Sequence, residues 1–263
     1  MQTTHYQAVF SDIDGTLLND QHQITPKTIA AIQRITQQGI PFIPVSARPP
    51  LAITPYTELL KTHQAIICYS GALILDRDLT PLYSVSINET DLIQLDLQLQ
   101  SFQHLSINYY ANTSWFSNDL ANAWTQQEAE ITGLQAVKKV EKLTNVHKIL
   151  VMGEAGEILR LEALLKRLFP QLSIHRSKAE YLEIMNHNAT KSAAIRFMQK
   201  RLGIATEHIV AFGDNFNDLD MLQYVGFSVA MANAPDEIKA AASYVTASNN
   251  EDGIALVLDK LFS

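Results

Sequence analysis

Short apolar runs recur along this chain, and each ends on small or ionisable polar residues. The runs lie at residues 7–10, 40–45, 65–69 and 208–212, and the polar residues that follow them are Ser11–Asp12, Ser46, Ser70 and Gly213–Asp214. Segments with a helical pattern separate consecutive runs in each half of the chain. Strands that alternate with helices are typical of a parallel sheet covered by helices. The sequence therefore predicts an α/β fold with a parallel-sheet core.

The expected helices have recognisable ends. Residues 25–38 begin with Thr25 as N-cap and Pro26 in the first helical position, and Gly39 follows the last turn. Pro235 is expected to open a helix over residues 235–243 in the same way. Further helices are expected over residues 49–61, 190–202, 217–224 and 253–261, and a further strand over residues 227–231.

The carboxyl ends of parallel strands form the ligand-binding edge of an open α/β sheet. Asp12, Asp14, Ser46 and Asp214 follow strands that are far apart in sequence, so we expect them to converge at that edge. Independent surface loops would not repeat this arrangement. The convergence is the strongest indication of a functional site that does not depend on any known family.

Asp12 and Asp14 are two residues apart at the end of the first strand. Residues with this spacing on an extended chain point the same way, so both carboxylates are expected to face one site. Two close carboxylates repel unless a cation or a shared proton relieves them. Asp12 fits a nucleophile or metal ligand and Asp14 a general acid/base; the alternative is a loop in which acids cap a turn. An EF-hand calcium loop is excluded, because its sixth and twelfth positions would be Leu17 and Gln23.

A second acidic stretch follows the strand near residue 210. Residues 213–220, Gly-Asp-Asn-Phe-Asn-Asp-Leu-Asp, combine three acids with two amides. Oxygen-rich ligands of this kind suit a hard cation such as Mg²⁺, so we expect Asp214 to bind it with direct or indirect support from Asp218. Lys191, in the first turn of its helix, and Ser46 suit a phosphate; the alternatives are a solvated lysine and a turn residue.

Composition and charge exclude several classes of protein. The net charge of -7 argues against nucleic-acid binding, and no apolar run approaches the roughly 20 residues of a membrane span. The first six residues lack the basic and apolar regions of a signal peptide, so a cytoplasmic enzyme is expected. Cys68 is the only cysteine; we interpret it as a buried thiol and exclude an internal disulfide.

About 100 residues in the middle of the chain differ in character from both halves. Expected strands at 148–152 and 181–185, an amphipathic helix at 157–169 and a β-rich segment at 105–116 predict an α+β domain. We expect it at residues 84–186, inserted into a core of residues 1–83 and 187–263. Its aromatic residues could face a ligand, but we expect most of them in the domain's own core: Tyr109, Tyr110, Trp115 and Tyr181.

Four segments of the chain contain the candidate chemical groups: Asp12-Ile13-Asp14-Gly15-Thr16, Ser46, Lys191 and Gly213-Asp214-x-x-Asn217-Asp218. In this order they resemble the four motifs of the haloacid dehalogenase (HAD) superfamily. The long insert resembles its type-IIB cap, and the segments Met231–Ala234, Lys239–Ala242 and Asn249–Gly253 are similar to the Cof-type branch. The resemblance implies a Rossmann-like core with an inserted cap.

The resemblance also implies residue roles. Asp12 would be the nucleophile and Asp14 the acid/base of a phosphatase that works through an aspartyl-phosphate. Mg²⁺ would be bound by Asp12, the Asp14 carbonyl and Asp214, with Asp218 in support. The phosphate would be held by Ser46, Ala47, Arg48, Lys191 and Asn217. Two segments depart from the Cof-type pattern: Ser46-Ala47-Arg48 replaces Thr-Gly-Arg, and Ser70-Gly71-Ala72 replaces Asn-Gly-Ala.

The expected substrate is a small phosphate ester such as a sugar phosphate, and the expected oligomeric state is a monomer or weak homo-oligomer. Three other functions are considered. One is a phosphomutase or sugar-phosphate phosphatase of a neighbouring branch. The second is a phospho-receiver domain, which also combines clustered acids, a Ser or Thr and a Lys, but has no need of an inserted domain. The third is a binding protein without catalysis, which the presence of both Asp12 and Asp14 disfavours.

Overall fold

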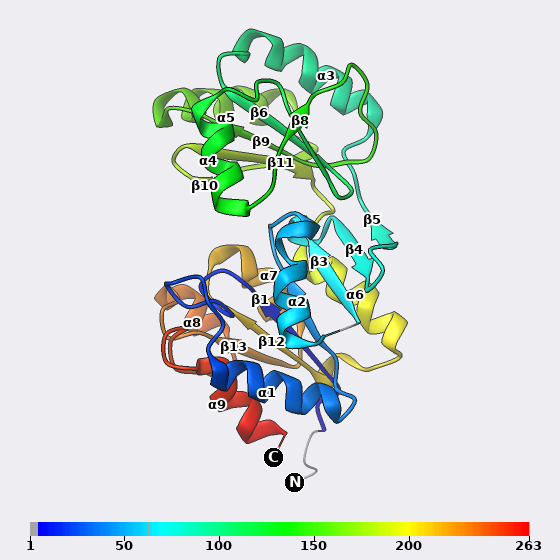
Figure 1. The fold of residues 1–263 in the computed structure, drawn as a ribbon, viewed down its shortest axis with the longest axis vertical. Coiled ribbons are helices and arrows are strands. Elements are labelled where there is room, and N and C mark those ends of the chain that lie inside the picture. The colour runs from blue at the N-terminus through cyan, green and yellow to red at the C-terminus, as the bar shows by residue number, and fades with distance from the viewer. Residues whose placement is uncertain (1–4, 63, 263) are drawn as a thin grey trace. The chain divides into compact units, whose positions relative to one another are not determined.

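The computed structural model describes residues 5–62 and 64–262. The chain forms two compact units (Figure 1). The core unit comprises the described residues up to Arg48, Ile53–Tyr83, and Thr190 onward. The inserted unit comprises Ser84–Ala189 together with the short segment Pro49–Ala52. In Figure 1 the inserted unit is mainly green, and the core unit is formed by the blue, cyan and yellow-to-red parts of the chain.

The core unit is built on an eight-stranded sheet with the order β14-β13-β12-β1-β2-β3-β4-β5. The strands are β1 Ala8–Asp12, β2 Phe42–Val45, β3 Ala65–Cys68, β4 Leu73–Asp76, β5 Pro81–Ser84, β12 Ile209–Gly213, β13 Phe227–Ala230 and β14 Tyr244–Val245. All pairings from β14 to β3 are parallel, which confirms the predicted sheet, and β4 pairs antiparallel with β3. β4 and β5 were not predicted, because short runs beside a turn give little periodicity.

The register aligns the carboxyl ends of the central strands. Asp12 pairs with Val45 of β2, and the preceding Ser11 pairs with Phe212 of β12. The residues that follow these strands therefore meet at one edge of the sheet, as predicted. Pro44 lies inside β2 opposite Ser11, where it has no N–H to donate to the ladder.

Helices cover both faces of the core sheet. They are α1 Pro26–Gln37, α2 Thr54–Leu60, α6 Lys191–Leu202, α7 Leu219–Tyr224, α8 Asp236–Ala241 and α9 Gly253–Leu261, with single turns η2 Tyr69–Gly71, η4 Thr206–His208 and η5 Phe216–Asp218; the further turn η1 Pro50–Ala52 belongs to the inserted unit. Helices α6, α7 and α8 share one apolar core with the sheet, and α1 packs against α9 (Figure 1). Most helix predictions are confirmed; the single helix expected over residues 49–61 is instead η1 and α2, interrupted at Ile53.

The inserted unit is built on a six-stranded sheet with the order β10-β11-β9-β6-β7-β8. Its elements are α3 Glu89–Leu99, η3 Gln100–Phe102, β6 Ser106–Ala111, β7 Ser114–Ser117, α4 Ala123–Thr132, β8 Val137–Lys138, β9 Val146–Met152, α5 Ala155–Leu168, β10 Leu172–Lys178 and β11 Tyr181–Asn186. Apolar side chains of α3 and α5 pack with residues such as Ile107 and Ile149 in one core. On the other face, Thr125 of α4 contacts Ser106 at 2.7 Å. The four aromatic residues expected to be buried are at most 7% exposed, which confirms that prediction.

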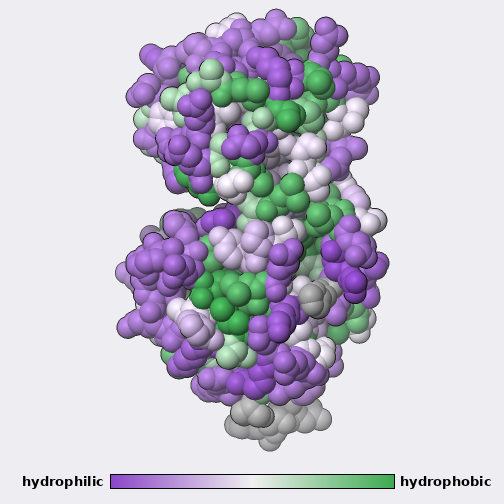
Figure 2. Space-filling model, in the orientation of Figure 1, coloured by the Kyte–Doolittle hydropathy of each residue, from purple (hydrophilic) through white to green (hydrophobic). Residues whose placement is uncertain are grey.

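On the face shown in Figure 2, hydrophilic side chains prevail on both units, with apolar side chains gathered in patches between them. Within the described residues, no helix combines the length and the apolar character needed to cross a membrane.

Candidate active site

The first strand delivers Asp12 to the carboxyl edge of the sheet and then turns sharply. Asp12 is the last residue of β1 and is 5% exposed. The turn needs Gly15, whose φ of +81° is in the region that favours glycine. A Cβ at this position would also lie 2.4 Å from Oδ2 of Asp214. Gly15 therefore brings the loop after β1 close to the loop after β12.

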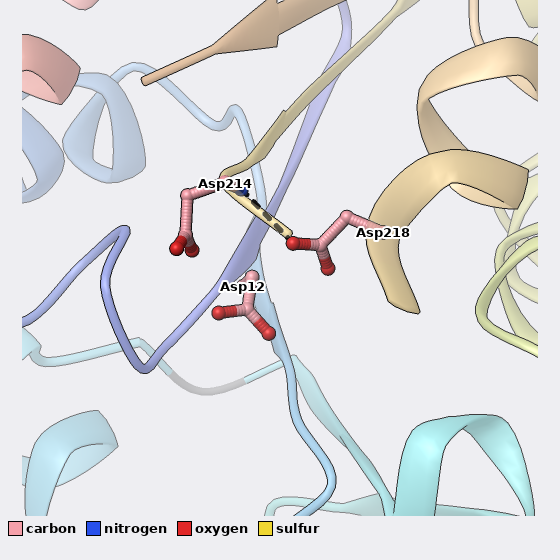
Figure 3. Close-up of side chains that lie close together, drawn as sticks. All are labelled: Asp12, Asp214 and Asp218. Carbon is pink, nitrogen blue, oxygen red and sulfur yellow. Dashed lines mark hydrogen bonds between the residues drawn. The ribbon is translucent and has the colours of Figure 1, made fainter. Parts of the chain in front are cut away.

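Three carboxylates converge at this edge: Asp12, Asp214 and Asp218 (Figure 3). One oxygen of each lies within 4.8 Å of the other two. Asp12 ends β1, and the other two residues belong to the loop and the η5 turn after β12. The expected convergence of Asp12 with the second acidic stretch is therefore present, and we call these three residues the acid cluster.

Lys191 lies between two members of the acid cluster. Its Nζ donates to Oδ1 of Asp12 and to Oδ1 of Asp218, each at 2.5 Å, and its side chain is 1% exposed. Burial would lower the pKa of Lys191, but the charges of Asp12 and Asp218 outweigh burial and raise it. A cation in the first turn of α6 opposes the helix dipole, and the two carboxylates offset that cost. The alternative prediction, that Lys191 is a solvated lysine on the surface, is therefore wrong.

Asp218 fixes the geometry of its loop. Its Oδ2 accepts hydrogen bonds from the backbone N–H groups of Asp214 at 2.9 Å and Asn215 at 3.0 Å, and its Oδ1 accepts from Lys191. A Cβ on Gly213 would lie 2.6 Å from the Cβ of Asp218, so only glycine fits there. Asp218 is fully buried, and both of its oxygens are engaged within the protein. It therefore acts mainly by holding Asp214 and Lys191 in place.

Asp214 is oriented by Thr16, whose hydroxyl donates to its Oδ1 at 2.6 Å. Burial raises the pKa of Asp214 to about 6, although the hydrogen bond from Thr16 acts in the opposite direction. Burial and the charge of Asp218 likewise raise the pKa of Asp12, against the effect of Lys191. Ionising either carboxyl group therefore costs more free energy here than it does in water, because the surrounding positive charge is insufficient.

These features fit a divalent cation. If ionised, the three carboxylates and the single ammonium of Lys191 leave two negative charges at the cluster. All the donors are oxygen atoms, which suits a hard cation such as Mg²⁺. Asp12 and Asp214 are the better direct ligands, because both oxygens of Asp218 already accept hydrogen bonds. The cluster therefore contains three of the four residues predicted to bind the metal, and it could hold a metal ion.

We expect Mg²⁺ to stabilise the protein more at high pH than at low pH. The folded metal-free protein retains the proton of Asp214 up to a pH of about 6, whereas an unfolded Asp loses it near 3.8. Folding stability from this group is therefore present below its unfolded pKa and is lost as the pH rises through about 6. A cation bound to the ionised form restores it. The Mg²⁺-induced shift in melting temperature should be larger at about pH 8 than at about pH 5. Asp214→Asn should remove this difference between the two pH values. Equal shifts at both pH values in the native protein would contradict the role of Asp214 as a metal ligand.

Asp14 lies apart from the acid cluster. Its carboxylate pairs with Arg48 through two hydrogen bonds, Nε to Oδ2 at 2.8 Å and Nη2 to Oδ1 at 2.5 Å. Its side chain is 48% exposed. The strand alternation used for the prediction ends at Asp12, because the chain leaves the sheet there. The two-residue spacing therefore does not place both carboxylates in one cluster in this conformation, and a metal contact from Asp14 would come from its backbone carbonyl.

The remaining predicted residues lie around this edge in different settings. Ser46 is 1% exposed, and its Oγ accepts the backbone N–H of Arg48 at 3.1 Å. Ala47 lies between them and is half-buried. Asn217 is exposed in the η5 turn beside Asp218. The structure thus places Ser46, Ala47 and Arg48 on one turn after β2.

Several supporting residues were not identified as such from the sequence. Gly71 has a φ of +104°, and a Cβ there would lie 2.1 Å from the carbonyl oxygen of Thr190, the N-cap of α6. Asn233 donates to the Gly15 carbonyl at 2.8 Å and accepts the Asn249 N–H at 3.1 Å. Each of these contacts joins residues more than 15 positions apart in the sequence. The only signal for them in the sequence is the residue type, a glycine or an asparagine.

The replacement of the usual asparagine by Ser70 leaves the local backbone contact in place. Ser70 has a φ of +52°, a region that asparagine enters more readily than serine. Its backbone N–H donates to the Ser46 carbonyl at 2.9 Å. The segment therefore keeps the contact between the turns after β2 and β3 with serine in this position.

Comparisons with known proteins are consistent with this geometry. The family model described as haloacid dehalogenase-like hydrolase matches residues 9–258. A Haemophilus influenzae protein named "Putative phosphatase" is 49% identical over 258 residues, which cover 98% of each chain. A crystal structure of a haloacid dehalogenase-like hydrolase from Bacteroides thetaiotaomicron has a TM-score of 0.90 and 27% identity, covering 98% of this chain and 100% of the other. A HAD subclass IIB sugar phosphatase has a TM-score of 0.82 over 97% of this chain and 98% of its own; at 22% identity it shows the fold alone.

Proposed function

The chain belongs to the haloacid dehalogenase-like hydrolases, and from this premise we propose that it is a Mg²⁺-dependent phosphatase of small phosphorylated metabolites. The observation that supports this best is the buried contact of Lys191 with Asp12 beside two further carboxylates. It combines a nucleophile with a fixed cation in one place. Sugar phosphates or similar esters are the substrate class that we propose.

Asp12 is the proposed nucleophile. An oxygen of Asp12 forms a bond to phosphorus while the bond from phosphorus to the ester oxygen breaks, giving an aspartyl-phosphate. A water molecule then attacks this phosphorus, the bond to Asp12 breaks, and inorganic phosphate leaves. Lys191 offsets the repulsion between the attacking carboxylate and the anionic ester, because it already contacts Asp12 at 2.5 Å.

Asp14 is the proposed general acid and base. It donates a proton to the leaving oxygen in the first step and accepts a proton from the attacking water in the second. Its greater exposure fits this exchange of protons, whereas Asp12 is buried. The two acids therefore have different roles although they are two residues apart.

The phosphoryl oxygens are proposed to contact Ser46, the Ala47 N–H, Arg48, Lys191 and Asn217. Mg²⁺, bound by Asp12, Asp214 and the Asp14 carbonyl with Asp218 in support, would supply positive charge to the transferring group. The inserted unit contributes none of these residues, and we propose residues 84–186 as a cap domain that selects among substrates.

Removal of metal is expected to abolish phosphatase activity. The full-length protein should hydrolyse p-nitrophenyl phosphate and a panel of metabolite phosphates, with turnover followed by phosphate release. Treatment with EDTA and desalting should eliminate turnover, because the charge of Lys191 alone does not balance the acid cluster. Added Mg²⁺ should restore it, and EDTA already saturated with Mg²⁺ is the control. Full activity of metal-free protein would contradict the proposal.

A further inference from the structure

The Arg48 side chain engages the proposed acid/base at both of its oxygens. Nε and Nη2 donate to the two carboxylate oxygens of Asp14, and Nη1 donates to the hydroxyl of Tyr56 at 3.3 Å. The guanidinium also lies over the Tyr56 ring, 5.6 Å from its centroid. The two N–H donors lie where a proton bound to the Asp14 carboxylate would sit, so Asp14 cannot act as an acid in this conformation. The pair must open for Asp14 to act.

Arg48 is held at the place where a phosphoryl group is proposed to bind. Its backbone N–H donates to Oγ of Ser46, on the turn that follows β2. Tyr56, on α2, contacts the far side of the guanidinium, and the Arg48 side chain is only 18% exposed, whereas that of Asp14 is 48% exposed. Of the two partners, Arg48 is therefore the fixed one and Asp14 the one that water can solvate when it is released.

The guanidinium fork fits a carboxylate and a phosphoryl group equally well. Both anions present two oxygens at the spacing of two parallel N–H donors. The fork can therefore bind either anion through both donors, but it cannot bind both anions in this way at once. A phosphate ester that arrives beside Ser46 therefore competes with Asp14 for Nε and Nη2 of Arg48. The outcome of this competition decides whether the acid is free.

We propose that Arg48 is a positioning residue: it holds Asp14 in the free enzyme and exchanges it for the phosphoryl group when an ester binds. The inference rests on the proposed phosphatase function and adds an order of events to it. Only after the phosphoryl group has taken the place of Asp14 on Arg48 is Asp14 free to take up a proton from solvent and pass it to the leaving oxygen. Arg48 thus acts on the proton transfer through Asp14 as well as on phosphate binding.

Binding of inorganic phosphate tests the exchange without turnover. Calorimetric titration in the presence of Mg²⁺ would compare the native protein, Asp14→Asn, Arg48→Lys and the double variant. An amide competes poorly for the fork, so Asp14→Asn should strengthen phosphate binding when Arg48 is present. The same change in the Arg48→Lys background should give a gain that is smaller by about threefold or more, because lysine offers no fork to share. Equal gains in both backgrounds would overturn the proposal, since charge removal alone would then explain them.

Asp78→Asn is the matched control for the loss of one carboxylate. Asp78 lies in the exposed turn between β4 and β5, and its side chain is 74% exposed. Its substitution should leave phosphate binding unchanged, and a gain as large as that of Asp14→Asn would overturn the proposal. Circular dichroism and melting temperatures of all variants verify that the fold is retained.

Kinetics provide a second readout that phosphate binding alone would not change. If Arg48 only bound phosphate, Arg48→Lys would raise KM for every ester and leave the ratio of kcat values between esters constant. Under the proposal it also lowers kcat, because Asp14 is no longer held beside the phosphoryl site before the exchange. The loss of kcat should be larger for an alkyl phosphate than for p-nitrophenyl phosphate, whose leaving group needs little protonation. A constant ratio of kcat values would overturn the positioning role. Absence of turnover in the native protein would refute the phosphatase function. The phosphate titration would still test whether phosphate replaces Asp14 on Arg48.

Discussion

Asp12→Asn is expected to abolish turnover of every phosphate ester while the fold survives. An amide oxygen is a far poorer nucleophile than a carboxylate, and no aspartyl-phosphate can form without Asp12. The substitution keeps the shape of a side chain that is 5% exposed, and Lys191 keeps its contact with Asp218. Because burial and neighbouring acids raise the pKa of Asp12, its charge is costly in the metal-free protein. The metal-free variant should therefore melt no lower than the native protein.

The measurement combines turnover with trapping. Phosphate release should be undetectable with p-nitrophenyl phosphate and with metabolite esters, and beryllofluoride, which mimics a phosphoryl group on a carboxylate, should no longer bind. Asp78→Asn, the same change at an exposed turn, should behave like the native protein. Substantial remaining turnover in Asp12→Asn would exclude Asp12 as the nucleophile.

Lys191→Met is expected to reduce both stability and activity. Lys191 is 1% exposed between Asp12 and Asp218, and its removal leaves two buried carboxylates without their cation. Breaking a buried ion pair by removing one partner costs about 3–5 kcal/mol of unfolding free energy. Turnover should also disappear, because the attacking carboxylate and the anionic ester then repel each other without the ammonium.

Urea unfolding of the metal-free variant should show this loss at neutral pH. The loss should shrink as the pH falls, because burial raises the pKa of Asp12 and this carboxyl, once protonated, needs no cation. Lys200→Met is the matched control on the same helix, since Lys200 is exposed in the last turn of α6. A Lys191→Met protein with native stability and native turnover would refute both the structural and the catalytic role.

The sequence by itself determined most of the core fold. The N-cap at Thr25, Pro26 at the helix start and Gly39 after its end defined α1, and Pro235 defined the start of α8. These signals act within a few residues, so they can be identified without a partner. The parallel sheet followed from the alternation of strands and helices, and the convergence of Asp12 with Asp214 followed from the direction of parallel strands.

Only the tertiary structure decided how the side chains at that edge pair. Lys191 meets Asp12 across 179 residues of sequence, and Asp14 turns to Arg48 once the strand has ended at Asp12. Gly71 is needed because the carbonyl oxygen of Thr190, which belongs to another element, lies where a side chain at position 71 would begin. Local patterns fix the backbone of one element, whereas side-chain pairing depends on distances between elements that adjoin only after folding. For that reason the sequence predicted that Asp12 meets Asp214 but wrongly placed the Asp14 carboxylate with them, and the tertiary structure determined that Asp12 is held by a lysine and Asp14 by an arginine.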